Sequence, residues 1–257
     1  MRAYKNNYRA FTLVELLVVI SILALLISIL IPSLAKAKER ARRVVCMSNI
    51  RQCTIACNLY AADFNSWLPL GNIWGDESKE EGWLDFNYQS AAYIHLNYKI
   101  EASHAMCTSW AFEKDKYFYE PPYVNNQNFK VGGTRIGYIY YGRRFDGESS
   151  TYSPMLENGQ VYKTPQRIGD FQNITSKTLF SCFHWDGIST GSGWGAKIPH
   201  IGGGKGQYIL PSQQGLKPKP EGLVISYLDS SSEWVSWKKL KWIEQASSIR
   251  LYFSNFH

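Results

Sequence analysis

The feature that most constrains this chain is an uninterrupted apolar run near its N-terminus, residues 11–31, FTLVELLVVISILALLISILI. The run contains one charged side chain, Glu15. About 20 helical residues span the ~30 Å apolar core of a bilayer, because a helix rises about 1.5 Å per residue. No comparable run follows, and the mean hydropathy of the whole chain is −0.28. We therefore predict a single-span membrane protein with a large soluble part.

A cleaved secretory signal is the first alternative, since basic residues precede the run. The apolar region of such a signal is only about 7–15 residues long and ends at a small-residue cleavage site. Here the run is longer and continues through Pro32 into a charged helical segment. The sequence favours a retained anchor, in which a carboxylate such as Glu15 is costly unless it has a partner.

The net charge of +7 comes from residues that flank the span. These basic residues are Arg2, Lys5, Arg9, Lys36, Lys38, Arg40, Arg42 and Arg43. Without them, and without Glu15 and Glu39, the chain is close to neutral. The basic balance thus indicates a membrane boundary, and no nucleic-acid partner is expected.

The segment after the span keeps a helical pattern to about Asn65. One face carries Cys46, Ile50, Cys53, Cys57, Tyr60 and Phe64, at alternating steps of three and four. The opposite face carries Arg42, Asn49, Arg51 and Asn58. We expect one long helix, bent slightly at Pro32, whose apolar stripe is covered by the rest of the chain.

The remainder is rich in aromatic residues and turns, with 9 Trp, 17 Tyr, 12 Phe, 20 Gly and 10 Pro in the whole chain. This composition favours β-structure. The predicted strands are 135–141, 178–183, 222–228 and 233–237. The glycine-rich stretch 187–206 and the segment 215–222 are predicted loops.

The N-terminal residues Ala10-Phe11-Thr12-Leu13-Val14-Glu15, followed by LLVVISILALL, resemble the start of a type IV pilin precursor or a type II secretion pseudopilin. In that family a prepilin peptidase cuts after a short basic leader and methylates the new N-terminal Phe. The resemblance implies a cut between Ala10, where the family usually has Gly, and Phe11. It also implies that the Phe11 amine of one subunit neutralises Glu15 of its neighbour, and that Pro32 bends the helix.

The end of the predicted helix, CMSNIRQCTIACNLYAADFNSWLP, is similar to pilin-like proteins of planctomycete and lentisphaeral bacteria. Those proteins share a C-x-x-N-[LI]-[RK]-Q pattern and a C-terminal region in which a His precedes an Asp-Gly turn between two strands. Here His200 opens PHIGGG, and GLVISYLDSSSEWVSW supplies strand, turn and strand, with Ser230 in place of the Gly.

Five cysteines lie on the side of the membrane where disulfides persist, if the head is extracytoplasmic. Cys46 and Cys53 are two helical turns apart, and a bridge between Cys53 and Cys57 would be strained. The residues therefore allow a disulfide from the helix to Cys107 or Cys182, or one between those two. The resemblance implies the pairing Cys46–Cys107.

The sequence gives only weak evidence for a phosphate-binding, hydrolytic or metal site elsewhere in the chain. GGGKG at 202–206 lacks the spacing of a phosphate-binding loop. His184 and Asp186, with Ser189 and His200 nearby, suggest a hydrolase or a metal site, but no third ligand or nucleophile motif accompanies them. We expect no cofactor, no metal and no catalysis.

The resemblance implies an α+β, pilin-like fold in which a long N-terminal helix packs on an antiparallel sheet. The expected organisation is a leader (1–10), a transmembrane helix (11–31), its amphipathic continuation (32–65) and a β-rich aromatic head (66–257). The expected function is that of a subunit or minor component of a type IV pilus or type II secretion pseudopilus. Expected partners are the prepilin peptidase, other pilin or pseudopilin subunits, inner-membrane lipid and the assembly platform.

Two other hypotheses remain from the sequence. One is a membrane-anchored binding protein that uses a pilin-type anchor without polymerising and recognises carbohydrate or the cell envelope through its aromatic residues. The other is an anchored periplasmic hydrolase that uses His184 and Asp186.

Overall fold

The computed structural model describes residues 12–73, 81–101, 104–105, 107–109, 133–135, 138–143, 155–156, 165–169, 174, 176–182, 185–186, 196–198, 200, 207–209, 221–245 and 249–253. These residues form a long helix, a short helix and antiparallel sheets, which is the α+β arrangement expected from the sequence. The helices are α1 (Leu13–Asp63), α2 (Tyr88–Tyr98) and the 3-10 turn η4 (Trp237–Lys239). The strands are β1 (Gly71–Ile73), β2 (Glu81–Asn87), β3 (Gly133–Arg135), β4 (Tyr138–Tyr140), β5 (Met155–Leu156), β6 (Thr178–Cys182), β7 (Trp185–Asp186), β8 (Ala196–Ile198), β9 (Gln207–Ile209), β10 (Gly222–Tyr227), β11 (Ser232–Ser236), β12 (Lys241–Gln245) and β13 (Ile249–Phe253).

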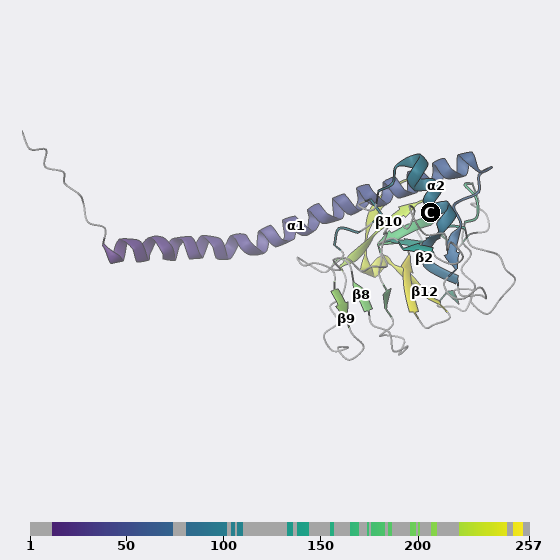
Figure 1. The fold of residues 1–257 in the computed structure, drawn as a ribbon. Helices are drawn as coiled ribbons and strands as arrows, with labels where there is room; N and C mark the ends of the chain where they lie inside the picture. The colour runs from purple at the N-terminus through teal and green to yellow at the C-terminus, as the bar shows by residue number, and fades with distance from the viewer. Residues whose placement is uncertain are drawn as a thin grey trace, which may run out of the picture.

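Helix α1 runs without interruption for 51 residues, with Pro32 inside it. Its N-terminal part projects away from the head and its C-terminal part lies along the head, on a gently curved course (Figure 1). The helix ends at Asp63, close to the predicted boundary. Asn65 and Ser66 then take left-handed backbone conformations, with φ of 50° and 69°, that turn the chain back towards the head.

A four-stranded antiparallel sheet, in the order β11-β10-β6-β4, packs beneath the C-terminal half of α1. Every residue of β10 and β6 is buried. Strands β10 and β11 form a regular hairpin in which Gly222 pairs with Ser236 and Ser226 with Ser232. The strand, turn and strand predicted after His200 are therefore confirmed.

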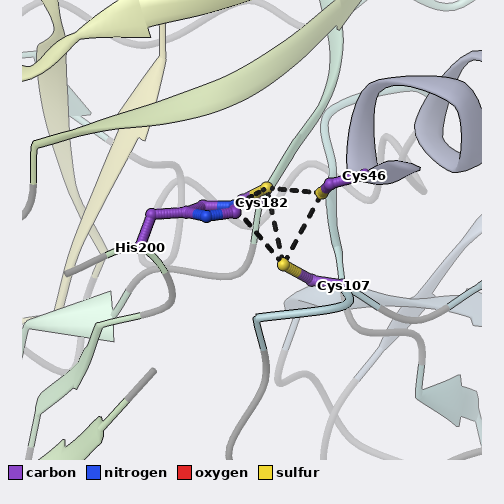
Figure 2. A group of neighbouring side chains, drawn as sticks. All are labelled: Cys46, Cys107, Cys182 and His200. Carbon is purple, nitrogen blue, oxygen red and sulfur yellow. Dashed lines mark hydrogen bonds between the residues drawn. The ribbon is translucent and has the colours of Figure 1, made fainter. Parts of the chain in front are cut away.

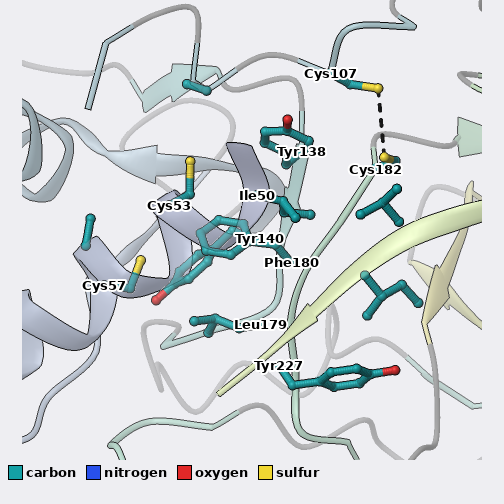
Figure 3. Close-up of a cluster of buried hydrophobic side chains, with 14 of the residues drawn as sticks. Ile50, Cys53, Cys57, Cys107, Tyr138, Tyr140, Leu179, Phe180, Cys182 and Tyr227 are labelled. Atoms are coloured by element: carbon teal, nitrogen blue, oxygen red, sulfur yellow. Dashed lines mark hydrogen bonds between the residues drawn. The ribbon is translucent and has the colours of Figure 1, made fainter. Parts of the chain in front are cut away.

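The main core lies between α1 and this sheet (Figure 3). The helix contributes Cys46, Ile50, Cys53, Ala56, Cys57 and Ala61, and the strands contribute residues such as Tyr138, Tyr140, Phe180, Leu223 and Ile225. The apolar stripe predicted on α1 is buried as far as Cys57, whereas Tyr60 is half-buried and Phe64 is exposed at the end of the helix. Asn49, expected on the polar face, is buried instead.

Two further sheets complete the described part of the head. One has the order β1-β2-β3, and the other has the order β5-β12-β13-β7-β8-β9. The labelled strands β8, β9 and β12 of the larger sheet lie on the side of the head away from α1 (Figure 1).

The strand predictions were correct in part. The predicted strand 135–141 contains the end of β3 and the whole of β4. The strand predicted over 233–237 corresponds to β11, which ends at Ser236 because Trp237 begins η4. The loop expected over 187–206 was wrong for Ala196–Ile198, which forms β8. Helix α2 and strands β12 and β13 were not predicted.

Candidate functional site

The first candidate site is the exposed N-terminal half of α1. Its large apolar side chains from Leu13 to Ile31 are between 48% and 86% exposed. Among the described residues, α1 is the one helix long and apolar enough to cross a membrane, and its apolar part lies near the N-terminus. Such exposure is unfavourable in water, so this half of the helix needs lipid or other apolar partners.

Glu15 lies in the first turn of α1 and takes part in a capping box. The Thr12 hydroxyl accepts a hydrogen bond from the Glu15 backbone N–H at 3.2 Å, and the Glu15 carboxylate accepts one from the Thr12 backbone N–H at 2.9 Å. The arrangement satisfies backbone donors at the start of the helix. Ala10 and Phe11, the predicted processing residues, lie outside the described residues.

The second candidate site is a buried cluster of Cys46, Cys107, Cys182 and His200 (Figure 2). The four residues come from distant parts of the chain: Cys46 from α1, Cys182 from the end of β6, and Cys107 and His200 from the connecting segments 107–109 and 200. All four are between 0% and 3% exposed. Their candidate ligand atoms all lie within 4.8 Å of one another.

The three sulfur atoms form a triangle. Cys46 Sγ lies 3.1 Å from Cys182 Sγ and 3.5 Å from Cys107 Sγ, and the third side measures 3.8 Å. His200 Nε2 faces this triangle at 3.3 Å from Cys182 Sγ and 3.6 Å from Cys107 Sγ. The cluster therefore presents three sulfurs and one ring nitrogen to a common centre.

The other side of the His200 ring contacts a second set of polar groups. Its Nδ1 lies 2.8 Å from Glu39 Oε1 and 2.9 Å from Ser109 Oγ. Glu39 is 3% exposed and forms ion pairs with Arg42 at 3.6 Å and Arg43 at 3.3 Å. A carboxylate against Nδ1 favours the tautomer with the proton on Nδ1, which leaves Nε2 as the atom that faces the sulfurs.

The environment shifts the pKa values of these groups in different directions. Burial raises the pKa of Cys46 and of Cys182 well above the usual thiol range. Hydrogen bonds from Cys182 and Cys46 lower the pKa of Cys107, and the charge on His200 adds to this effect. Burial alone would lower the pKa of His200, but the charge and hydrogen bond of Cys107, together with Glu39, raise it to about 9. The environment thus favours a thiolate at Cys107 and protonated thiols at Cys46 and Cys182.

The predicted disulfide partners Cys46 and Cys107 are neighbours in this cluster, and their sulfur atoms lie 3.5 Å apart without a bond in this structure. The disulfide stays a prediction. Cys53 and Cys57, also on α1, are not part of the cluster, and Figure 3 shows them apart from Cys107 and Cys182.

Sequence reasoning missed the cluster as a unit. It treated the cysteines as disulfide candidates and His200 as a marker of the C-terminal region, and it grouped His200 with His184 and Asp186. The structure places His200 with the cysteines, while Asp186 lies in β7 opposite Arg250. His184 lies outside the described residues. No short-range motif could have shown the cluster, because its members are separated by 61, 75 and 18 residues along the chain.

An exposed apolar helix whose second half packs on a sheet, together with the N-terminal sequence motif, defines a pilin-like, membrane-anchored protein. Residues 5–31 match the prokaryotic N-terminal methylation motif. Residues 35–179 match the family described as "Protein of unknown function (DUF1559)", and the chain belongs to this family.

The chain is similar to the type IV wide pilus major component PilA4 of Thermus thermophilus, with 39% identity over 62 residues. The match covers 24% of this chain and 47% of the relative, so the chain spans about half the length of the curated relative it matches. No solved structure matches the chain.

Proposed function

We propose that this protein is a subunit or minor component of a type IV pilus or type II secretion pseudopilus, with assembly rather than catalysis as its activity. One observation carries the proposal. The segment that matches the methylation motif extends into a helix whose large apolar side chains are about half or more exposed from Leu13 to Ile31. In a membrane this helix is an anchor, and in a filament the same surface packs against neighbouring helices.

The proposed path begins at the inner membrane, with the short N-terminus cytoplasmic and the head periplasmic. The prepilin peptidase cuts between Ala10 and Phe11 and methylates the new amine. The assembly platform then moves the helix from lipid into a bundle of pilin or pseudopilin subunits. There the Phe11 amine of one subunit replaces the Thr12 backbone N–H as the partner of a neighbour's Glu15. An unpaired carboxylate in the bundle would be costly, so this pairing selects one register.

Processing is tested by the intact mass of the protein purified from membranes of its native host. Loss of residues 1–10 and addition of one methyl group, about 14 Da, to Phe11 are expected. An unprocessed chain would contradict the proposal and favour the anchored binding protein as the function.

Assembly is tested by comparing Glu15→Ala with Thr12→Ala in the native host. Both substitutions break the capping box, at a cost of about 0.5–2 kcal/mol to the start of the helix. Only Glu15→Ala removes the carboxylate that pairs between subunits. We expect Glu15→Ala to abolish recovery of the protein in sheared filaments and Thr12→Ala to retain most of it. Equal recovery from both variants would contradict the assembly role of Glu15.

A further inference from the structure

We infer that Cys46, Cys107, Cys182 and His200 form a structural zinc site. The inference does not depend on filament assembly, because all four residues lie in the head or in the head-packed half of α1.

The spacing of the donor atoms fits tetrahedral zinc. With Zn–S of about 2.3 Å and Zn–N of about 2.0–2.1 Å, a tetrahedron places sulfurs about 3.8 Å apart and sulfur and nitrogen about 3.5 Å apart. The sulfur–sulfur distances are 3.1, 3.5 and 3.8 Å. His200 Nε2 lies 3.3 Å from Cys182 Sγ and 3.6 Å from Cys107 Sγ. Three cysteines and one histidine are a standard donor set of closed, structural zinc sites.

The contacts of the His200 ring also fit a metal ligand. Metal-binding histidines usually donate the second ring N–H to a carboxylate or carbonyl, which orients the ring and makes the ligating nitrogen more basic. Glu39 and Ser109 occupy this position at Nδ1. The edge of the ring also contacts Trp234, with ring centroids 5.2 Å apart. The imidazole is therefore held with Nε2 towards the sulfurs.

Two arginines near the cluster offset much of the negative charge that a bound ion and its ligands would carry. Zinc with three thiolates and a neutral imidazole carries one net negative charge, and Glu39 carries another. Arg42 and Arg43, whose side chains are 16% and 17% exposed, both pair with Glu39, and Arg43 also pairs with the exposed Glu221. On binding, the ion displaces the protons held by Cys46, Cys182 and His200 Nε2 into solvent, and no oxidant is required.

A disulfide is the competing outcome for the same residues. It would join two of the three sulfurs, which are already in contact, and the head would lie where disulfides persist. It would leave the third sulfur unused and would give no role to an imidazole oriented by a buried carboxylate. These two features favour the metal.

The test uses the full chain purified from membranes in detergent, without chelators. We expect about one zinc per chain by elemental analysis, and five alkylatable thiols by mass after denaturation with chelator. A disulfide between any two of Cys46, Cys107 and Cys182 would overturn the inference. Iron or copper in place of zinc would overturn the identity of the metal.

Variants separate the ligands from other buried cysteines. Cys182→Ser and His200→Ala are expected to lower zinc content at least tenfold at limiting free zinc. Cys57→Ser is the matched control, because Cys57 is equally buried on α1 but lies outside the cluster. Glu39→Gln tests the positioning role and should weaken zinc affinity by about 10–100-fold. Wild-type zinc content in Cys182→Ser would overturn the site.

Exchange with cobalt(II) keeps the test valid if a ligand variant fails to fold. On the wild-type full chain, cobalt(II) in this site should show sulfur-to-metal charge-transfer bands in the near ultraviolet and the intense visible bands of a tetrahedral thiolate complex. Only weak visible bands, typical of an octahedral oxygen site, would overturn the inference.

Discussion

At the scale of single residues, the packing of α1 on the sheet includes specific polar contacts within an apolar interface. Thr54 and Ser226 are both fully buried, and their hydroxyl groups lie 2.6 Å apart. The Thr54 hydroxyl also donates to the Ile50 carbonyl at 3.0 Å. Buried polar groups are tolerated in such a core when they are hydrogen-bonded to each other.

We predict that Thr54→Val destabilises the head by about 1–3 kcal/mol, because it leaves the buried Ser226 hydroxyl without this partner. The measurement is urea unfolding of the full chain in detergent, followed by tryptophan fluorescence. Thr54→Val combined with Ser226→Ala should recover most of the loss, since both polar groups are then removed. A double variant less stable than Thr54→Val would show that the pair is not coupled in this way.

A second residue-scale contact joins α1 to the turn of the β10–β11 hairpin. The Asn58 side-chain amide donates to the Leu228 carbonyl at 3.0 Å and to the Ser230 hydroxyl at 2.8 Å. We predict that Asn58→Ala lowers the free energy of unfolding by about 1–2 kcal/mol, since it removes both hydrogen bonds. Arg51→Ala, at an exposed position of the same helix, is the control and should change the same urea midpoint little. Equal effects would contradict the role of Asn58.

At the scale of elements, Gly222 of β10 leaves no room for a side chain against β11. A Cβ atom at this position would clash with the Val235 carbonyl oxygen and lie 2.9 Å from the Trp234 ring. Trp234 also contacts His200 and lies under the Arg43 guanidinium, which is 3.9 Å from the ring centroid. The glycine therefore sets the strand separation next to the buried cluster.

We predict that Gly222→Ala destabilises the head by about 1–3 kcal/mol or more, because the strands or the Trp234 ring must shift to admit the methyl group. Thermal unfolding of the full chain in detergent measures the effect. Lys238→Ala, in the exposed turn η4, is the control and should leave the midpoint nearly unchanged. An unchanged midpoint in Gly222→Ala would show that the hairpin adapts without cost.

Prediction of elements from the sequence succeeded where one pattern extends over many residues. The length of the apolar run and the helical periodicity of the later stripe on α1 adjoin along the chain, and hydrogen bonds within a helix are local, so the helix was predicted almost to its end. Strands β12 and β13 were missed although they pair with each other as neighbours in the chain; their other partners, β5 and β7, are distant in sequence. Asn49 was misassigned because burial on α1 depends on what the sheet covers.

At the scale of the whole molecule, burial of α1 against the head should make the protein sensitive to alkali. Burial raises the pKa of Cys53 from 9.0 to about 12, and it also raises the pKa of Tyr141. Between pH 9 and about pH 12, Cys53 loses its proton in the unfolded state but keeps it in the folded state. The unfolded state then binds fewer protons, so stability falls as pH rises.

We predict that Cys53 alone lowers the free energy of unfolding by about 1.4 kcal/mol per pH unit over this range, which starts near pH 9 and ends near pH 12. When urea unfolding is measured across that pH range, the free energy of unfolding should fall less steeply with pH in Cys53→Ala than in the wild type. This holds whatever the difference in stability between the two proteins at neutral pH. Parallel declines would contradict the assignment of this titration to Cys53.

The sequence by itself determined the anchor, the long helix and the relationship to pilins. These depend on a contiguous apolar run and on neighbouring residues such as Phe11 and Glu15, whose meaning is local. Only the tertiary structure decided that Cys46, Cys107, Cys182 and His200 meet, and that Glu39, a charged residue of an exposed-looking helix segment, is buried against His200. The physical reason is that their distances depend on how α1, β6 and the connecting segments pack, and such long-range packing has no periodic signature in one sequence.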